Sequence, residues 1–135
     1  MARLKKDLDE ADKHLELALD FFKSENDLRG VARVLFYMGV VASDRRQSSK
    51  AKALFLQSME EAVKADRPDL VADCNYYLAV ITYRADHDTE TALRYVQEAL
   101  AIYDRVGMQA PRARSLADEI AMAMKDSDYS PLTEQ

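Results

Sequence analysis

The residues best suited to chemistry in this chain are its two histidines, its single cysteine and one dense acidic run. The run at 86–90, Asp-His-Asp-Thr-Glu, brings together oxygen and imidazole donors, as a metal site would. A calcium loop needs Gly at its sixth position and Glu at its twelfth, but Thr91 and Gln97 stand there. We therefore expect a solvated turn with a helix N-cap, and no metal.

The isolated His and Cys residues do not form a catalytic pattern either. His14 has no second ligand one helical turn later, because that place is Ala18. Cys74 lies in an apolar segment without a nearby histidine, as a buried small side chain would. The three glycines, at 30, 39 and 107, are too far apart for a phosphate-binding loop. We expect no enzyme activity and no cofactor.

The composition predicts a single helical domain. A chain of 135 residues has room for one domain, and 3 Gly and 3 Pro are too few for the turns of a many-stranded sheet. With 48% hydrophobic residues the chain is too apolar to be disordered. The net charge of −5, without a basic stripe, argues against nucleic acid as a direct partner.

The start of the sequence does not resemble a signal peptide. Lys5 and Lys6 are followed by acidic residues and not by the apolar run of a signal peptide. A lone cysteine cannot form an internal disulfide. No apolar stretch reaches the ~18 residues of a membrane span. We expect a cytoplasmic protein that does not use a membrane.

Apolar spacing predicts about six helices, in which amphipathic segments alternate with segments that are apolar on nearly every side. The second segment, near 27–45, and the fourth, which includes 71–83, are of the apolar kind and must be buried on more than one face. We expect a helical repeat domain at 1–125 and a polar tail at 126–135. The predicted helices begin near Leu4, Asp27, Ser49, Pro68, Thr89 and Pro111. Asn26 or Asp27 is the expected N-cap of the second, and Ser48 and Ser49 are expected to cap the third.

The alternation reflects an internal repeat of about 40 residues. Ala11, Ala51 and Ala92 lie 40 and 41 residues apart, and Val31-Ala32 recurs as Val71-Ala72. Two helices in each period of this length are typical of a helical solenoid, in which each helix pair covers the apolar face of the next.

These residues resemble the tetratricopeptide repeat family. Gly39 and Ala51 match the small residues of its two helices, and Ala79 and Ala92 repeat them. The remaining matches are Met38, Phe55 and Ser58 in one unit, Leu78, Val96 and Ala99 in the next, and either Ile120 or Ala121 in the third. The longer period is similar to that of kinesin light chains and of bacterial regulators. The resemblance implies a right-handed α-solenoid of antiparallel helix pairs that binds a protein or peptide segment.

The apolar helices carry more large side chains than packing within the repeat requires. In the family that the chain resembles, the corresponding places line the concave surface, so the resemblance implies a binding groove there. The candidate groove residues are Arg33, Phe36, Val40, Asp73, Tyr76, Val80, Tyr83 and Arg84. A bound segment would then carry a bulky apolar residue and an acidic one, because arginine pairs with carboxylate. The alternative is that these side chains are ordinary core or are covered by the tail.

A second surface is predicted on the first helix. Leu17 and Phe21 stand one turn apart and off the main apolar stripe. They would contact another subunit or an upstream helix. The first function hypothesis is therefore a non-catalytic protein-binding scaffold, and the alternative is a structural module for self-association.

Overall fold

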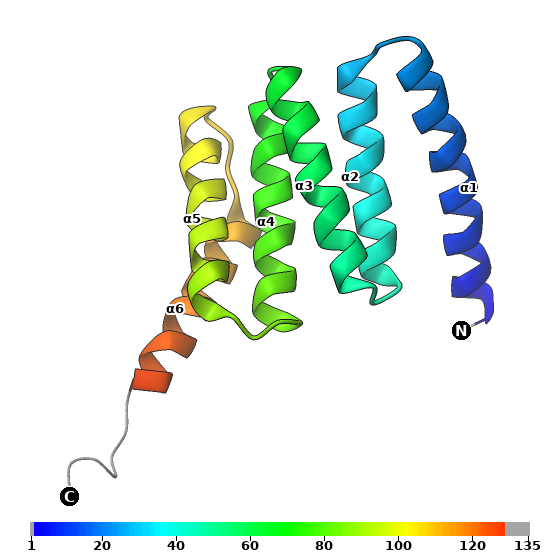
Figure 1. Ribbon diagram of the computed structural model, residues 1–135. Coiled ribbons are helices and arrows are strands. Elements are labelled where there is room, and N and C mark those ends of the chain that lie inside the picture. The colour runs from blue at the N-terminus through cyan, green and yellow to red at the C-terminus, as the bar shows by residue number, and fades with distance from the viewer. Residues whose placement is uncertain (1, 129–135) are drawn as a thin grey trace, which may run out of the picture.

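The computed structural model describes residues 2–128, and all regular structure in this range is α-helical. The helices run α1 (Ala2–Ser24), α2 (Leu28–Asp44), α3 (Ser48–Lys64), α4 (Pro68–Arg84), α5 (Thr89–Arg105) and α6 (Pro111–Asp128). Successive helices are antiparallel and stand side by side in a row from α1 to α5, with α6 angled away at the end (Figure 1). The predicted all-α solenoid of antiparallel helix pairs is confirmed.

The backbone of the loops repeats as regularly as the helices do. Each of the five loops contains one residue in the left-handed region, at positions 26, 46, 66, 87 and 107. These positions are 20 or 21 residues apart, so two helix-loop units make one sequence period. Gly107 adopts this conformation, with φ of 75°, without the steric strain that a Cβ brings.

Side-chain caps follow the prediction at two helices and depart from it at a third. Asp27 accepts a hydrogen bond from the Gly30 N–H at 3.0 Å, and Asp88 accepts one from the Thr91 N–H at 3.2 Å. The prediction of a serine cap for α3 was wrong, because the cap position is Gln47, whose side chain makes no capping bond. The proline that starts α4 is confirmed at the first turn, where its missing N–H costs nothing.

Contacts between the helices define an inner and an outer layer. Besides its neighbours in sequence, α4 contacts both α2 and α6. Within the described residues, the odd-numbered helices make no such contacts with one another. Since the even-numbered helices lie closer together, the stack bends toward them. They form the inner layer, and the odd-numbered helices form the outer layer. We call the surface formed by α2, α4 and α6 the even face.

The repeat's small residues allow close packing in the core. Ala51 and Ala92 are fully buried, and a Cβ added at Gly39 would lie 2.8 Å from the Phe55 ring. The buried hydroxyl of Ser58 donates to the Ala32 carbonyl at 2.7 Å and lies 3.4 Å from the Cys74 Sγ. These contacts connect α2, α3 and α4 into one rigid unit.

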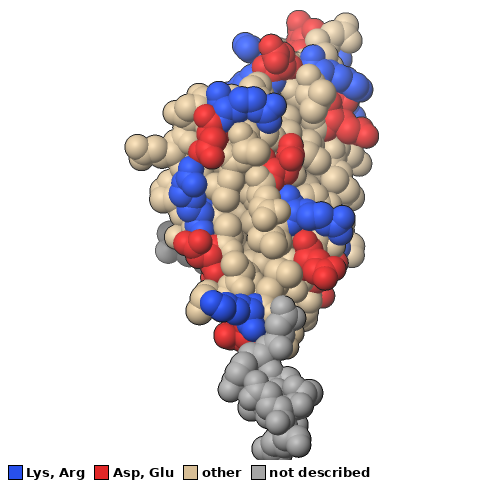
Figure 2. Space-filling model, turned by 90° about the vertical axis from the view of Figure 1, so that its left-hand side faces the viewer, with Lys and Arg blue, Asp and Glu red and all other residues tan. Residues whose placement is uncertain are grey.

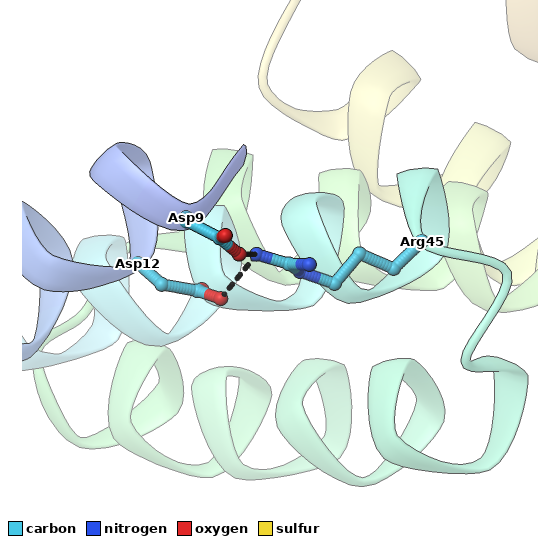
Figure 3. Close-up of polar contacts among 3 residues, drawn as sticks. All are labelled: Asp9, Asp12 and Arg45. Carbon is cyan, nitrogen blue, oxygen red and sulfur yellow. Dashed lines mark hydrogen bonds and ion pairs between the residues drawn. The ribbon is translucent and has the colours of Figure 1, made fainter. Parts of the chain in front are cut away.

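An ion cluster fastens the first helix to the rest. Arg45, which follows α2, donates to Asp9 at 2.5 Å and to Asp12 at 3.1 Å, both on α1 (Figure 3). The hydrogen bond from Arg45 lowers the pKa of the exposed Asp9 carboxyl below its ordinary 3.8. The ionised form therefore favours the docked position of α1.

The last helix extends beyond the predicted domain boundary. The sequence placed the start of the tail at residue 126, whereas α6 continues to Asp128. The remainder of the predicted tail, 129–135, lies outside the described residues.

Candidate functional site

The loop between α5 and α6 is fixed by hydrogen bonds to the end of α5. The Met108 N–H donates to the Tyr103 carbonyl at 2.8 Å, and the Gly107 N–H donates to the Asp104 carbonyl at 3.2 Å. This pair of bonds is a Schellman motif, which requires the left-handed residue that Gly107 supplies. Residues 108–111 are thereby held against α4.

A cleft of about 290 Å³ lies between α4, α6 and this loop. We call it the α4–α6 cleft. Its walls come from four helices, α2, α4, α5 and α6, and from residues 108–110 of the loop. The aromatic and charged side chains that line it are Phe36, Asp73, Tyr76, Tyr77, Tyr103 and Arg112. Three of these, Phe36, Asp73 and Tyr76, are among the predicted groove residues.

Aromatic rings form one wall of the cleft. The ring of Tyr77 meets that of Phe36 edge to face, with centroids 5.3 Å apart, and meets that of Tyr76 in the same way at 5.4 Å. Tyr77 also stacks on the fully buried Phe55 at 5.3 Å. Because the rings are braced by the core, the wall is preformed.

Asp73 supplies the cleft's carboxylate. It is half-buried and accepts a hydrogen bond from the Tyr103 hydroxyl, which comes from α5. Burial raises the pKa of the Asp73 carboxyl above 3.8; the Tyr103 bond opposes the rise and the Asp69 carboxylate adds to it. Burial and the bond to Asp73 also raise the pKa of the Tyr103 hydroxyl, so the phenol remains a donor.

Arg112 stands at the rim, where its guanidinium carbon lies 5.2 Å from the centroid of the Tyr76 ring. A neighbouring hollow of about 310 Å³ shares both of these residues and is lined in addition by Arg84 and Glu119. The predicted Arg84 thus lines a hollow together with the same aromatic ring. Tyr76, Pro111 and Arg112 are common to the cleft and the hollow.

The other predicted groove residues line neither space. Arg33 is exposed on α2, and Val40 is half-buried beside the core. Val80 and Tyr83 are half-buried and pack against the part of the core that lies between α4, α5 and α6. Of the predicted set, Phe36, Asp73, Tyr76 and Arg84 line the cleft or the hollow.

One predicted anchor is nearly buried. Phe36, predicted as a groove residue, lines the cleft but is only 8% exposed. Its neighbour Tyr37 is 50% exposed, one turn after Arg33, and is the aromatic residue that projects from α2. Phe36 is buried because Tyr77 of the next repeat packs over it.

Sequence reasoning missed Tyr103, Arg112 and the loop residue Met108. Tyr103 appears in the pattern only as an apolar position of the fifth helix, and Arg112 only as a polar residue of the sixth. Neither the hydrogen bond to Asp73 nor the position over Tyr76 leaves a periodic signal, because the first depends on how α5 packs on α4 and the second on how α6 packs on α4.

Leu17 and Phe21 are 69% and 58% exposed on α1. They lie off the stripe that packs on α2, as the spacing predicted. What they contact outside this chain stays a prediction.

The other residues singled out in the sequence have structural roles. Cys74 is fully buried, and burial raises the pKa of its thiol to about 11. Asp86 pairs with Lys52 at 2.5 Å, and Asp88 caps α5. Among the described residues, no three His, Cys, Asp or Glu side chains gather where they could hold a metal ion. Likewise, no helix in that range is both long and apolar enough to span a bilayer.

Charges of both signs are mixed on the end of the molecule that carries α5 and α6. Figure 2 shows acidic and basic side chains alternating along both edges of an uncharged strip on this face. The face shown has no continuous basic stripe of the kind that binds a phosphate backbone.

Comparison of the chain with protein-family models, with curated proteins and with solved structures found no match.

Proposed function

We propose that this chain is a non-catalytic cytoplasmic scaffold that binds a protein or peptide segment on its even face, as the resemblance to tetratricopeptide repeats suggests. The segment lies across α4 between α2 and α6. One of its side chains enters the α4–α6 cleft, and an acidic residue pairs with the exposed Arg84.

The observation that carries the proposal is the preformed aromatic cleft. Its wall of three rings is braced by the core, and Tyr76 is shared with the hollow that Arg84 borders. Aromatic and arginine side chains are enriched where protein interfaces gain most of their binding energy. The mixed charge on the face in Figure 2 gives no support to a nucleic-acid partner.

A titration of the partner against four variants tests this proposal. Tyr76→Ala and Tyr83→Ala should each weaken binding by about 2 kcal/mol if the ring is a hot spot, without loss of helix content. Arg84→Glu should lower mainly the association rate and its salt dependence. The control is Glu60→Lys, on the exposed side of α3. If only the control weakens binding, the recognition surface is the opposite layer and the proposal is wrong.

Self-association is a second candidate function, favoured by the exposure of Leu17 and Phe21 on one side of α1. Such large apolar side chains lose contact with water when a second copy covers them. Sedimentation of the chain decides this: a concentration-dependent mass that Leu17→Glu/Phe21→Glu abolishes supports self-association, and a constant monomer mass excludes it.

A further inference from the structure

The α4–α6 cleft contains a carboxylate that forms no direct ion pair, although the charges of Arg112 and Arg67 act on it from farther away. Asp73 accepts from the Tyr103 hydroxyl, but among the described residues no Lys, Arg or His nitrogen lies within 4.0 Å of it. Asp69, one turn earlier on α4, is paired with Arg67 at 2.9 Å. A half-buried carboxylate is stabilised by a cation that reaches it.

The walls of the cleft favour a flat cation. Tyr76, Tyr77 and Phe36 present ring edges and faces beside the carboxylate, and ring faces attract cations. A guanidinium can donate two hydrogen bonds to a carboxylate while it stacks on a ring, which an ammonium cannot do. At about 290 Å³ the cleft lies at the lower end of the range of small-molecule sites, roughly 300–1,000 Å³, so it suits a single side chain.

The charges of the molecule agree with this choice. The net charge of −5 attracts a basic segment. Arg112 already lies over Tyr76 at 5.2 Å, which shows that this ring accepts a guanidinium. The same positive charge at the rim opposes a second cation, so its removal has opposite effects on a cationic and on an acidic guest.

We propose that the α4–α6 cleft receives the guanidinium of an arginine in the bound segment, with Asp73 as its ion-pair partner and the tyrosine rings as its stacking surface. This inference rests on the proposed function and specifies its anchor. The acidic residue expected at Arg84 lies outside the cleft, at the neighbouring hollow that Arg84 lines.

The test is an NMR titration of the full chain with three probes: the N-acetyl methylamides of arginine, norleucine and glutamate. The arginine probe should shift the ring signals of Tyr76 and Tyr77 with a Kd on the order of 1–10 mM, and the other two should not. Asp73→Asn keeps an acceptor for Tyr103 and should weaken the arginine probe roughly tenfold. The matched control, Asp44→Asn, removes the same charge from the exposed end of α2 and should have no such effect.

The Arg112→Gln variant tests whether the group that enters the cleft is positively charged. It should strengthen binding of the arginine probe, because it removes a like charge from the rim. The proposal is overturned if the norleucine or glutamate probe titrates in place of arginine, if arginine produces no saturable shift, or if Asp73→Asn binds arginine as wild type does. In each case the scaffold function stands as long as Tyr76→Ala still weakens the natural partner. If arginine titrates but Tyr76→Ala leaves the partner's affinity unchanged, the scaffold proposal fails instead.

Discussion

Replacing Gly39 with alanine tests the packing that supports the cleft. The added Cβ would lie 2.8 Å from one ring carbon of Phe55 and 3.0 Å from two others. The ring cannot move aside easily, because it is fully buried between Phe36, at 5.6 Å, and Tyr77, at 5.3 Å. Overpacking of this kind costs about 1–3 kcal/mol.

Alanine also gains helix propensity over glycine, by about 1 kcal/mol. This gain is measured separately with Ala53→Gly, at an exposed position of α3. Gly39→Ala should therefore be less stable, by about 1–3 kcal/mol, than that propensity difference alone predicts. Urea unfolding followed by circular dichroism gives both values. If Gly39→Ala stabilises the protein by the full propensity difference, the close approach of α2 and α3 is refuted.

Four further changes probe other parts of the molecule. Ala51→Leu should lower the free energy of unfolding by about 1–3 kcal/mol, because this fully buried position has no room for a larger side chain. Asp73→Asn should raise urea resistance at neutral pH, because burial raises the pKa of the folded-state carboxyl; the difference should shrink as pH falls through that raised pKa and vanish below 3.8. Arg45→Gln should return the pKa of Asp9 toward 3.8 and speed amide exchange in α1 alone. The double variant Leu17→Glu/Phe21→Glu should remain folded, because both side chains are exposed.

Each of these four predictions has an outcome that would contradict it. An unchanged thermal midpoint in Ala51→Leu would mean that the helix pair is not tightly packed there. A stability difference for Asp73→Asn that grows on acidification would mean that the folded state favours the ionised carboxylate. Uniform exchange across all helices in Arg45→Gln would show that α1 does not open separately. Unfolding of the double variant would place Leu17 and Phe21 in the core.

The fold could be predicted from the sequence because the residues that recur in the repeat are those that pack between helices. Small residues at Gly39, Ala51 and Ala92 and the alternation of apolar and amphipathic helices are local signals of helix faces. The loops were harder to predict, because Arg46 adopts a left-handed backbone conformation that its type does not favour. There the regular spacing of the helices decides the loop conformation.

The sequence alone left the alignment of the third repeat with the first two undecided, and the structure decides it. Either Ile120 or Ala121 fitted the small-residue place. Ile120 is fully buried, as Ala79 is, whereas Ala121 is exposed, which puts Ile120 at the small-residue place. Helix periodicity identifies a buried stripe, but it does not say which neighbour covers it.

The candidate site was predicted only in part for the same reason. Phe36 and Tyr76 are equivalent in the repeat, yet Phe36 is covered by Tyr77, whereas Tyr76 lines the cleft and carries Arg112 over its ring. The difference arises because the loop before α6 is the longest in the domain and α6 diverges from the row (Figure 1). Periodicity fixes the faces of helices but not the angles between them.

Site-specific photo-crosslinking in cells tests most directly whether the even face binds a partner. A photoreactive phenylalanine replaces Tyr37, which is 50% exposed on α2, or Leu56, which is 43% exposed on α3 in the outer layer. The scaffold account predicts a discrete cross-linked protein from position 37 that disappears when Tyr76→Ala is added, and none from position 56. Cross-linking from position 56 alone, or from position 37 unaffected by Tyr76→Ala, would contradict it.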